Sequence, residues 1–183
     1  MDKRVFHQIN YGLYLIGARL GDKINGQIAN SVFQVTSTPP KIAVSLHKEN
    51  LTHKYVVMSK MLSISVLSEE TPLKFIGIFG FKSGKDIDKF AGIKYKLGIE
   101  NIPIVLENAI GYLELRVTDI LDVGSHSLFI CEVLNSELLD NCNPMTYAYY
   151  HLVKCGKSPK SAPTYVEEKN NSGEENMKKF KCT

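Results

Sequence analysis

The sequence predicts a mainly antiparallel β-barrel with a few short helices. Several short runs alternate apolar and polar residues or are rich in β-formers, and turns rich in Gly and Pro separate them. No βαβ spacing repeats along the chain, which argues against a doubly wound parallel sheet. About six or seven strands with only short helices between them suit an antiparallel barrel better.

The first part of the chain predicts a hairpin followed by a third strand. Residues 13–19 (LYLIGAR) form an apolar run typical of a strand, and 21–26 hold turn residues that tolerate positive φ. Residues 28–35 are expected to form the second strand of the hairpin. Pro39 and Pro40 then punctuate the chain before a third strand at 42–46.

The middle of the chain predicts short helices. Thr52 is placed to cap a helix that ends near Ser59. Thr71 and Pro72 favour the start of a second helix, as N-cap and first helical residue. The other elements expected here are a strand at 61–67, a glycine-rich loop at 77–84 and a short helix at 86–91.

A second hairpin and an arm complete the predicted chain. Strands at 112–120 and 128–134 alternate and are joined by a turn at 122–126, and a last strand is expected at 150–153. Lys, Ser, Pro, Asn and Glu dominate residues 154–179, a composition typical of a linker or extended arm.

Charge and cysteine usage narrow the class of protein. The net charge is +3, but residues 1–153 hold 15 basic and 15 acidic residues, so the excess lies in the arm and a nucleic-acid surface is not expected. No apolar run approaches the ~18 residues of a membrane helix, and no secretory signal opens the chain, which predicts a cytoplasmic protein. No CxxC spacing and no disulfides are expected among Cys131, Cys142, Cys155 and Cys182.

Polar residues in two places suggest a ligand, and each has a plainer interpretation. Asn30, Ser31 and Gln34 interrupt the apolar pattern of the second strand, so they either line a polar planar ligand or make cross-strand hydrogen bonds on an edge strand. Residues 45–54 (SLHKENLTHK) combine a strand end with a helix start, which suits either a phosphate or ordinary capping by Thr52.

Other motifs limit the kinds of site that the sequence supports. Residues 80–90 fail the P-loop spacing, although Lys85 or Lys89 can serve an anion if the run is not simply solvated. His126, in a turn, is either a ligand donor or solvated. The five histidines lack metal-ligand spacing, so no metal site is expected in 1–153. Neither a Gly-x-Ser-x-Gly elbow nor a cysteine nucleophile motif is present.

Four motifs in order carry a resemblance. They are TSTPPKIAVSL at 36–46, NLTH at 50–53, SGKDIDKF at 83–90 and GSHSLFICEV at 124–133, with APTY at 162–165 behind them. Together they resemble the flavin reductase-like family, which has an FMN-binding split β-barrel. The resemblance covers about residues 7–166 and implies a homodimer with FMN near the subunit interface.

The resemblance also implies site residues by motif position. Around the isoalloxazine and ribityl chain it places Asn25, Ala29, Asn30 and Ser31, and by the ribityl–phosphate end Ser45, His47, Asn50 and Thr52. It pairs Lys89 with phosphate or a ring oxygen, sets His126 near the ring and has Tyr165 cover the ring from the arm. Some relatives carry an aromatic where Ser31 stands.

A second resemblance lies at the end of the chain. Residues 177–183 (MKKFKCT) are similar to the opening of a rubredoxin, with Cys182 as an iron ligand, unless they are simply a basic tail. Flavin reductase domains fused to rubredoxin form the high-molecular-weight rubredoxins, which pass electrons from NAD(P)H to flavodiiron proteins. The expected division is a flavin domain at 1–153, an arm at 154–176 and a rubredoxin start at 177–183.

The resulting hypothesis is an FMN oxidoreductase that takes electrons from NADH or NADPH to an acceptor such as a rubredoxin domain or flavodiiron protein. No essential acid–base residue is expected, because the flavin carries the chemistry. Two alternatives stay open: a flavin electron carrier that does not itself oxidise NAD(P)H, and a non-catalytic flavin-binding or assembly domain.

Overall fold

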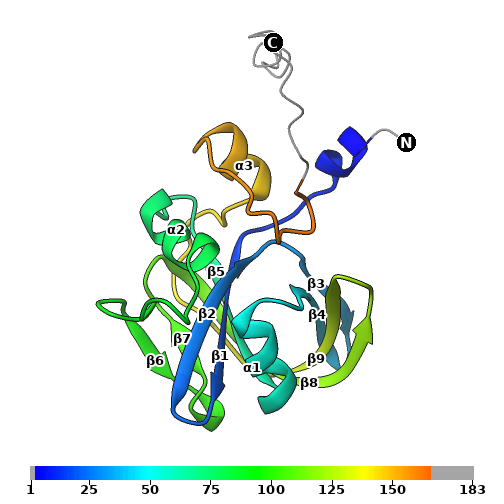
Figure 1. The fold of residues 1–183 in the computed structure, drawn as a ribbon, viewed down its shortest axis with the longest axis vertical. Coiled ribbons are helices and arrows are strands. Elements are labelled where there is room, and N and C mark those ends of the chain that lie inside the picture. The colour runs from blue at the N-terminus through cyan, green and yellow to red at the C-terminus, as the bar shows by residue number, and fades with distance from the viewer. Residues whose placement is uncertain (1–2, 166–183) are drawn as a thin grey trace, which may run out of the picture.

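The computed structural model describes residues 3–165, and its centre is a seven-stranded antiparallel sheet in the order β2-β1-β5-β8-β9-β4-β3 (Figure 1). Its strands are β1 (Tyr14–Leu20), β2 (Lys23–Ala29), β3 (Val32–Ser37), β4 (Pro40–His47), β5 (Met61–Leu67), β8 (Ala109–Asp122) and β9 (His126–Leu138). The smaller elements are the β6 (Tyr95–Leu97) and β7 (Pro103–Val105) pair, helices α1 (Leu51–Ser59), α2 (Leu73–Phe81) and α3 (Tyr147–Leu152), and 3-10 turns at Lys3–Gln8 and Ile99–Asn101.

The sheet must curl, because its two edge strands are consecutive in the chain. β2 and β3 lie at opposite edges, yet only Asn30 and Ser31 separate them. Two linking residues span about 11 Å at most, whereas a flat sheet of seven strands is about 29 Å wide. The edges therefore approach each other there, and the described strand pairings include no β2–β3 ladder. The mainly antiparallel fold is confirmed, as a curled sheet with an open seam between β2 and β3.

Two hydrophobic cores lie on the two faces of the sheet. Alternation along β1 sends Ile16 into one core and Leu15 into the other. The first core holds Phe129 of β9 together with Val56, so α1 packs inside the curl. The second holds Phe79, and α2 and α3 cover that face. The site described below lies where β2 separates these two cores.

The predicted strand at 28–35 is wrong as a single element. β2 ends at Ala29 and β3 begins at Val32, so Asn30 falls in the break between two edge strands rather than within one strand. The turn predicted at 21–26 is also too long, since β2 already starts at Lys23. Ile24 and Ile28 both pack against the second core, and that packing extends the strand through the predicted turn.

Packing also overrides local propensity at three other places. Glycines suggested a loop at 77–84, but α2 continues to Phe81 because buried Phe75 and Phe79 anchor it. The helix predicted at 86–91 is a series of turns. The strand predicted at 150–153 is helix α3, whose N-cap Thr146 accepts a hydrogen bond from the Tyr149 backbone N–H at 3.1 Å.

The predicted helix starts are slightly displaced. Asn50, not Thr52, is the N-cap of α1, and Thr52 lies inside the first turn. Pro72 rather than Thr71 is the N-cap of α2. Sequence reasoning missed β6 and β7, because strands of three residues are too short to show alternation. The strands expected at 13–19, 42–46, 61–67, 112–120 and 128–134 are confirmed, as is the hairpin through 122–126.

Candidate functional site

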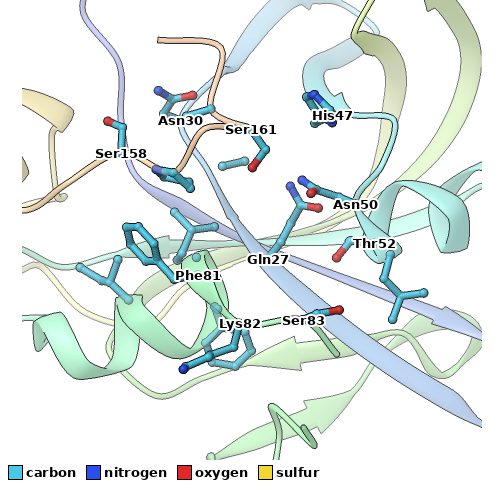
Figure 2. Close-up of a pocket in the computed structure, with 18 of the residues that line it drawn as sticks. Gln27, Asn30, His47, Asn50, Thr52, Phe81, Lys82, Ser83, Ser158 and Ser161 are labelled. Carbon is cyan, nitrogen blue, oxygen red and sulfur yellow. The ribbon is translucent and has the colours of Figure 1, made fainter. Parts of the chain in front are cut away.

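A cavity of about 390 Å³ lies at the open end of the seam between β2 and β3. β2 forms its floor, and the start of α1, the end of α2 with the following loop, and arm residues 157–163 form its walls (Figure 2). The volume falls in the range of about 300–1,000 Å³ typical of small-molecule sites. The curled sheet therefore brings segments that are far apart in the chain to one pocket.

Most of the predicted site residues gather at this cavity. Those that line it are Asn25, Ala29, Asn30, Ser45, His47, Asn50, Thr52, Lys89 and His126. Ser31 is not among the lining residues, and its hydroxyl donates to Asn30 Oδ1 at 3.1 Å. Tyr165 does not line the cavity either, whereas Ala162 and Pro163 of the same arm do. Contact between a ligand and the predicted site residues, Ser31 and Tyr165 included, stays a prediction.

The floor of the cavity depends on alternation along β2. Asn25, Gln27 and Ala29 are buried, line the cavity and share one face of the strand. Asn25 Nδ2 donates to Thr52 Oγ1 at 2.9 Å, which ties the strand to the first turn of α1. A Cβ at Gly84 would lie 2.1 Å from Asn25 Oδ1, so only glycine lets that loop approach so closely.

Gln27 is the residue in this floor that sequence reasoning missed. The residue is 9% exposed, and its Oε1 is buried without a hydrogen-bond donor among the described residues. The signal was present in the sequence, because 25, 27 and 29 alternate. It was lost when 21–26 was assigned to a turn. Ser83, Ser158 and Ser161, which also line the cavity, were likewise missed.

The cavity is electropositive. Its lining holds one carboxylate, Glu49, against Lys82, Lys85, Lys89 and Lys157. Lys89 is only 6% exposed and donates to the carbonyls of Gly26 at 2.9 Å and Phe79 at 3.2 Å. Burial lowers the pKa of Lys89 to about 8, so the ammonium carries an uncompensated charge at neutral pH. A ligand with an anionic group fits this lining.

Two imidazoles stand beside the cavity opening. The rings of His47 and His126 meet edge to face with centroids 4.8 Å apart. Burial, and secondly the proximity of His47, lower the pKa of His126. His126 is therefore neutral at pH 7, and its Nε2 lies 3.3 Å from the backbone oxygen of Ser161, to which it donates. The His126 ring therefore contributes hydrogen bonds, and not a positive charge, at the cavity opening.

The start of α1 adds backbone donors to one wall. Asn50 caps the helix without a side-chain hydrogen bond, and Leu51 and Thr52 line the cavity. The first-turn N–H groups of a helix lack intrahelical acceptors and carry partial positive charge. Together with the lysines they form an arrangement that can hold a phosphate.

The arm closes the cavity opposite α2. Thr164 Oγ1 accepts from Asn30 Nδ2 at 2.9 Å and donates to the Tyr147 hydroxyl at 2.8 Å. The Tyr147 hydroxyl also contacts that of Ser158, which lines the cavity. Figure 2 shows Asn30, Ser158 and Ser161 together on this side. The arm thus acts through residues 157–163; the predicted arm beyond Tyr165, and Cys182, lie outside the described residues.

The remaining reactive groups offer no second centre. Cys131 is buried in the first core, and burial raises its pKa to about 12, while Cys142 and Cys155 are exposed and separate. Across residues 3–165 no cluster of three or more His, Cys, Asp or Glu is arranged to hold a metal ion. Over the same span no helix is long and apolar enough to cross a membrane.

The fold and the cavity define a small split-barrel protein with an electropositive pocket. Residues 6–156 match the flavin reductase like domain, and the chain belongs to that family. Relatives support this membership. The chain is 48% identical over 185 residues to a high molecular weight rubredoxin of Moorella thermoacetica, an alignment that covers all of this chain and 80% of the relative.

Two further comparisons agree. A ferric-chelate reductase (NAD(P)H) of Archaeoglobus fulgidus is 45% identical over 169 residues, covering 92% of this chain and the whole relative. An NADH:FAD oxidoreductase of Streptomyces globisporus has the same fold with a TM-score of 0.71 at 23% identity, covering 80% of this chain and 87% of that one. The resemblance found in the sequence is therefore confirmed at the level of family.

Proposed function

We propose that this chain binds FMN in the cavity and passes electrons from NAD(P)H through the flavin to an acceptor. The observation that carries the proposal is an electropositive cavity with a buried, unpaired amide oxygen, in a chain of the flavin reductase-like family. Relatives whose names specify NAD(P)H or NADH and FMN support both the cofactor and the electron donor.

The lining residues fit FMN. The first turn of α1, with Thr52 and the lysines, would hold the phosphate by backbone N–H groups and charge. Asn30 and Gln27, at the seam, would contact the polar edge of the ring. The arm residues Ser161 to Pro163 would cover the ligand, because they form the opposite wall.

FMN, when bound, accepts a hydride and releases electrons singly or in pairs. The protein's part is to orient the ligand, to exclude water and to set the local charge. Lys89 and the uncapped first turn of α1 favour negative charge on the ligand, and neutral His126 holds the arm closed through Ser161. No side chain is assigned as an acid or base.

The electron acceptor is proposed from the relatives. The relative named a high molecular weight rubredoxin favours a rubredoxin-type acceptor. A flavodiiron protein as the next acceptor is what the sequence resemblance implies. A ferric chelate is the second candidate, since the relative named a ferric-chelate reductase aligns over its whole length. Exposed Lys82 and Lys85 at the cavity would attract an anionic chelate.

The test has three steps. Purified protein loaded with FMN should absorb near ~450 nm and release FMN on denaturation. Anaerobic mixing with NADH and NADPH should bleach that band, and addition of oxidised rubredoxin or ferric citrate should restore it. Failure to bind FMN would refute the proposal. If FMN binds but neither NADH nor NADPH bleaches its absorption band, the protein is an electron carrier. If FMN binds but no electron transfer occurs at all, the protein is an assembly domain.

A homodimer belongs to the same proposal. Edge strand β3 exposes Phe33 and Val35, 55% and 50% exposed, and the β8–β9 hairpin exposes Leu121 and Val123. An exposed apolar edge strand favours pairing with a second copy of the chain. Sedimentation of Phe33→Lys beside the unaltered protein tests it, since a dimer that uses β3 becomes a monomer. The cytoplasmic location stays a prediction.

A further inference from the structure

Gln27 is the one polar residue of the cavity floor whose hydrogen-bonding capacity is not used by the protein. Asn25 and Asn30, its neighbours on the seam, each donate to a threonine at 2.9 Å. Gln27 Oε1, by contrast, is buried and has no donor among the described residues. The side chain rises from β2 among the lining residues in Figure 2.

An unpaired buried carbonyl is rare in native proteins and weakens the fold that contains it. Retaining one at the floor of a cavity therefore indicates a ligand that supplies the donor. The residue is 9% exposed and its Oε1 is buried, so bulk solvent does not compensate the oxygen. An apolar residue of similar size would pack here without that cost, as Ile28 beside it packs against the second core.

The chemistry of the ligand ring narrows which donor this can be. The oxidised isoalloxazine presents several acceptors along its polar edge but one N–H donor, the imide N–H at position N3. Lys89 and His126, which also line the cavity, are donors, and in this structure both donate to backbone carbonyls. Gln27 Oε1 is the buried side-chain oxygen of this lining that has no donor among the described residues, and an acceptor of this kind matches the imide N–H.

We propose that Gln27 Oε1 accepts the imide N–H of the flavin ring and makes the cavity specific for that donor. This inference rests on the proposed function and names one atom pair within it. Because the imide N–H is present in both redox states of FMN, Gln27 contributes to affinity in both and leaves the midpoint potential unchanged. The unpaired oxygen also makes the empty protein less stable than it would be with an apolar side chain.

The experiment compares two ligands on four proteins. FMN and N3-methylated FMN, which lacks the imide N–H, are titrated by flavin fluorescence. The proteins are the unaltered chain, Gln27→Met, Gln27→Glu and the control Gln34→Met. Met removes the acceptor with little change of size, and Glu keeps an acceptor oxygen. Gln34, on β3, is exposed and does not line the cavity, which makes it a matched control.

The unaltered protein and the Gln34→Met control should bind FMN about ten-fold more tightly than its methylated form, the factor expected for one hydrogen bond to a buried acceptor. Gln27→Met should bind both ligands equally, about ten-fold more weakly than the unaltered protein binds FMN. Without ligand it should unfold at the same temperature or higher. Gln27→Glu should retain the preference for FMN.

Several results would overturn the inference while leaving FMN binding intact. They are equal affinity of the unaltered protein for both ligands, a preference that persists in Gln27→Met, or a lower midpoint potential in that variant. The last would place Gln27 against an atom that gains a proton on reduction. If Gln27→Met did not fold, equal affinity in the unaltered protein or Gln27→Glu would still refute it. Absence of any FMN binding would instead refute the proposed function.

Discussion

Lys89 provides a test of the cavity's electrostatics that needs no ligand. Its ammonium is buried against the carbonyls of Gly26 and Phe79, and its pKa falls from 10.5 to about 8. Because one pKa unit is worth about 1.4 kcal/mol, burying the charged form costs about 3 kcal/mol more than burying the neutral form. That cost should be visible as a pH dependence of stability.

The sign follows from proton binding. Between pH 8 and 10.5 the unfolded Lys89 holds its proton while the folded one has released it, so the free energy of unfolding rises with pH across this window. Below pH 8 both states are charged and the whole cost is present. Other groups titrate at alkaline pH, so the quantity to follow is the difference between the unaltered protein and Lys89→Met.

Urea unfolding at intervals from pH 7 to 10.5 measures this difference. As the pH rises from 7 to 10.5, the free energy of unfolding of the unaltered protein should increase by about 3 kcal/mol relative to that of Lys89→Met. The hydrogen bonds lost in Lys89→Met add a contribution that does not change with pH. Lys74→Met, which removes an exposed lysine of α2, is the control and should show no such change. A flat difference for Lys89→Met would refute the reasoning. With FMN bound, the change should shrink, because an anionic partner raises the pKa of Lys89.

Three further predictions follow from single contacts. Gly84→Ala puts a Cβ within 2.1 Å of Asn25 Oδ1 and should weaken FMN binding about ten-fold in a fluorescence titration, whereas Gly77→Ala, with open space around it, should stabilise α2 by about 0.5–1 kcal/mol and leave binding unchanged. Thr164→Val removes the two hydrogen bonds that Thr164 makes, to Asn30 and Tyr147, and should speed FMN dissociation about ten-fold in stopped-flow displacement. A rate equal to that of the exposed-site control Thr118→Val would contradict the arm's role. Cys131 should resist a thiol reagent in the folded protein while Cys142 and Cys155 react, which peptide mapping resolves; rapid modification of Cys131 would contradict its burial.

The site residues were predicted from the family resemblance, whereas the strands around them were predicted from residue patterns. Asn25 and Asn30 were assigned by motif position, and both line the cavity although the strand was placed at 28–35. Ordered motifs survive errors in element boundaries, because they carry the positions of side chains directly. Gln27 was not carried over by the resemblance, and the turn placed over 21–26 hid the alternation of 25, 27 and 29 that would have revealed it.

The errors in the fold share one physical cause. Tyr150 suggested a strand and Gly77 a loop, because aromatic residues favour strands and glycine weakens helices locally. Both lie in helices beside the second core, where Phe79 and Tyr150 are buried. Long-range packing decides these segments, and a single sequence does not display it. The strands at 13–19, 42–46 and 61–67 were predicted to within two residues of their ends, whereas β8 and β9 extend up to four residues beyond the predicted bounds.

The open seam explains why the cavity exists where it does. Two residues join the edge strands β2 and β3, so the edges are close enough to pair and close the sheet. Instead, Asn30 turns its amide to Thr164 of the arm, and His126 at the start of β9 reaches Ser161. The arm therefore bridges the end of the seam, because it bonds to Asn30 at the end of β2 and to His126 of β9. A ladder between β2 and β3 would remove the space that Gln27 and Asn25 now line, so keeping this seam open is a requirement of the site.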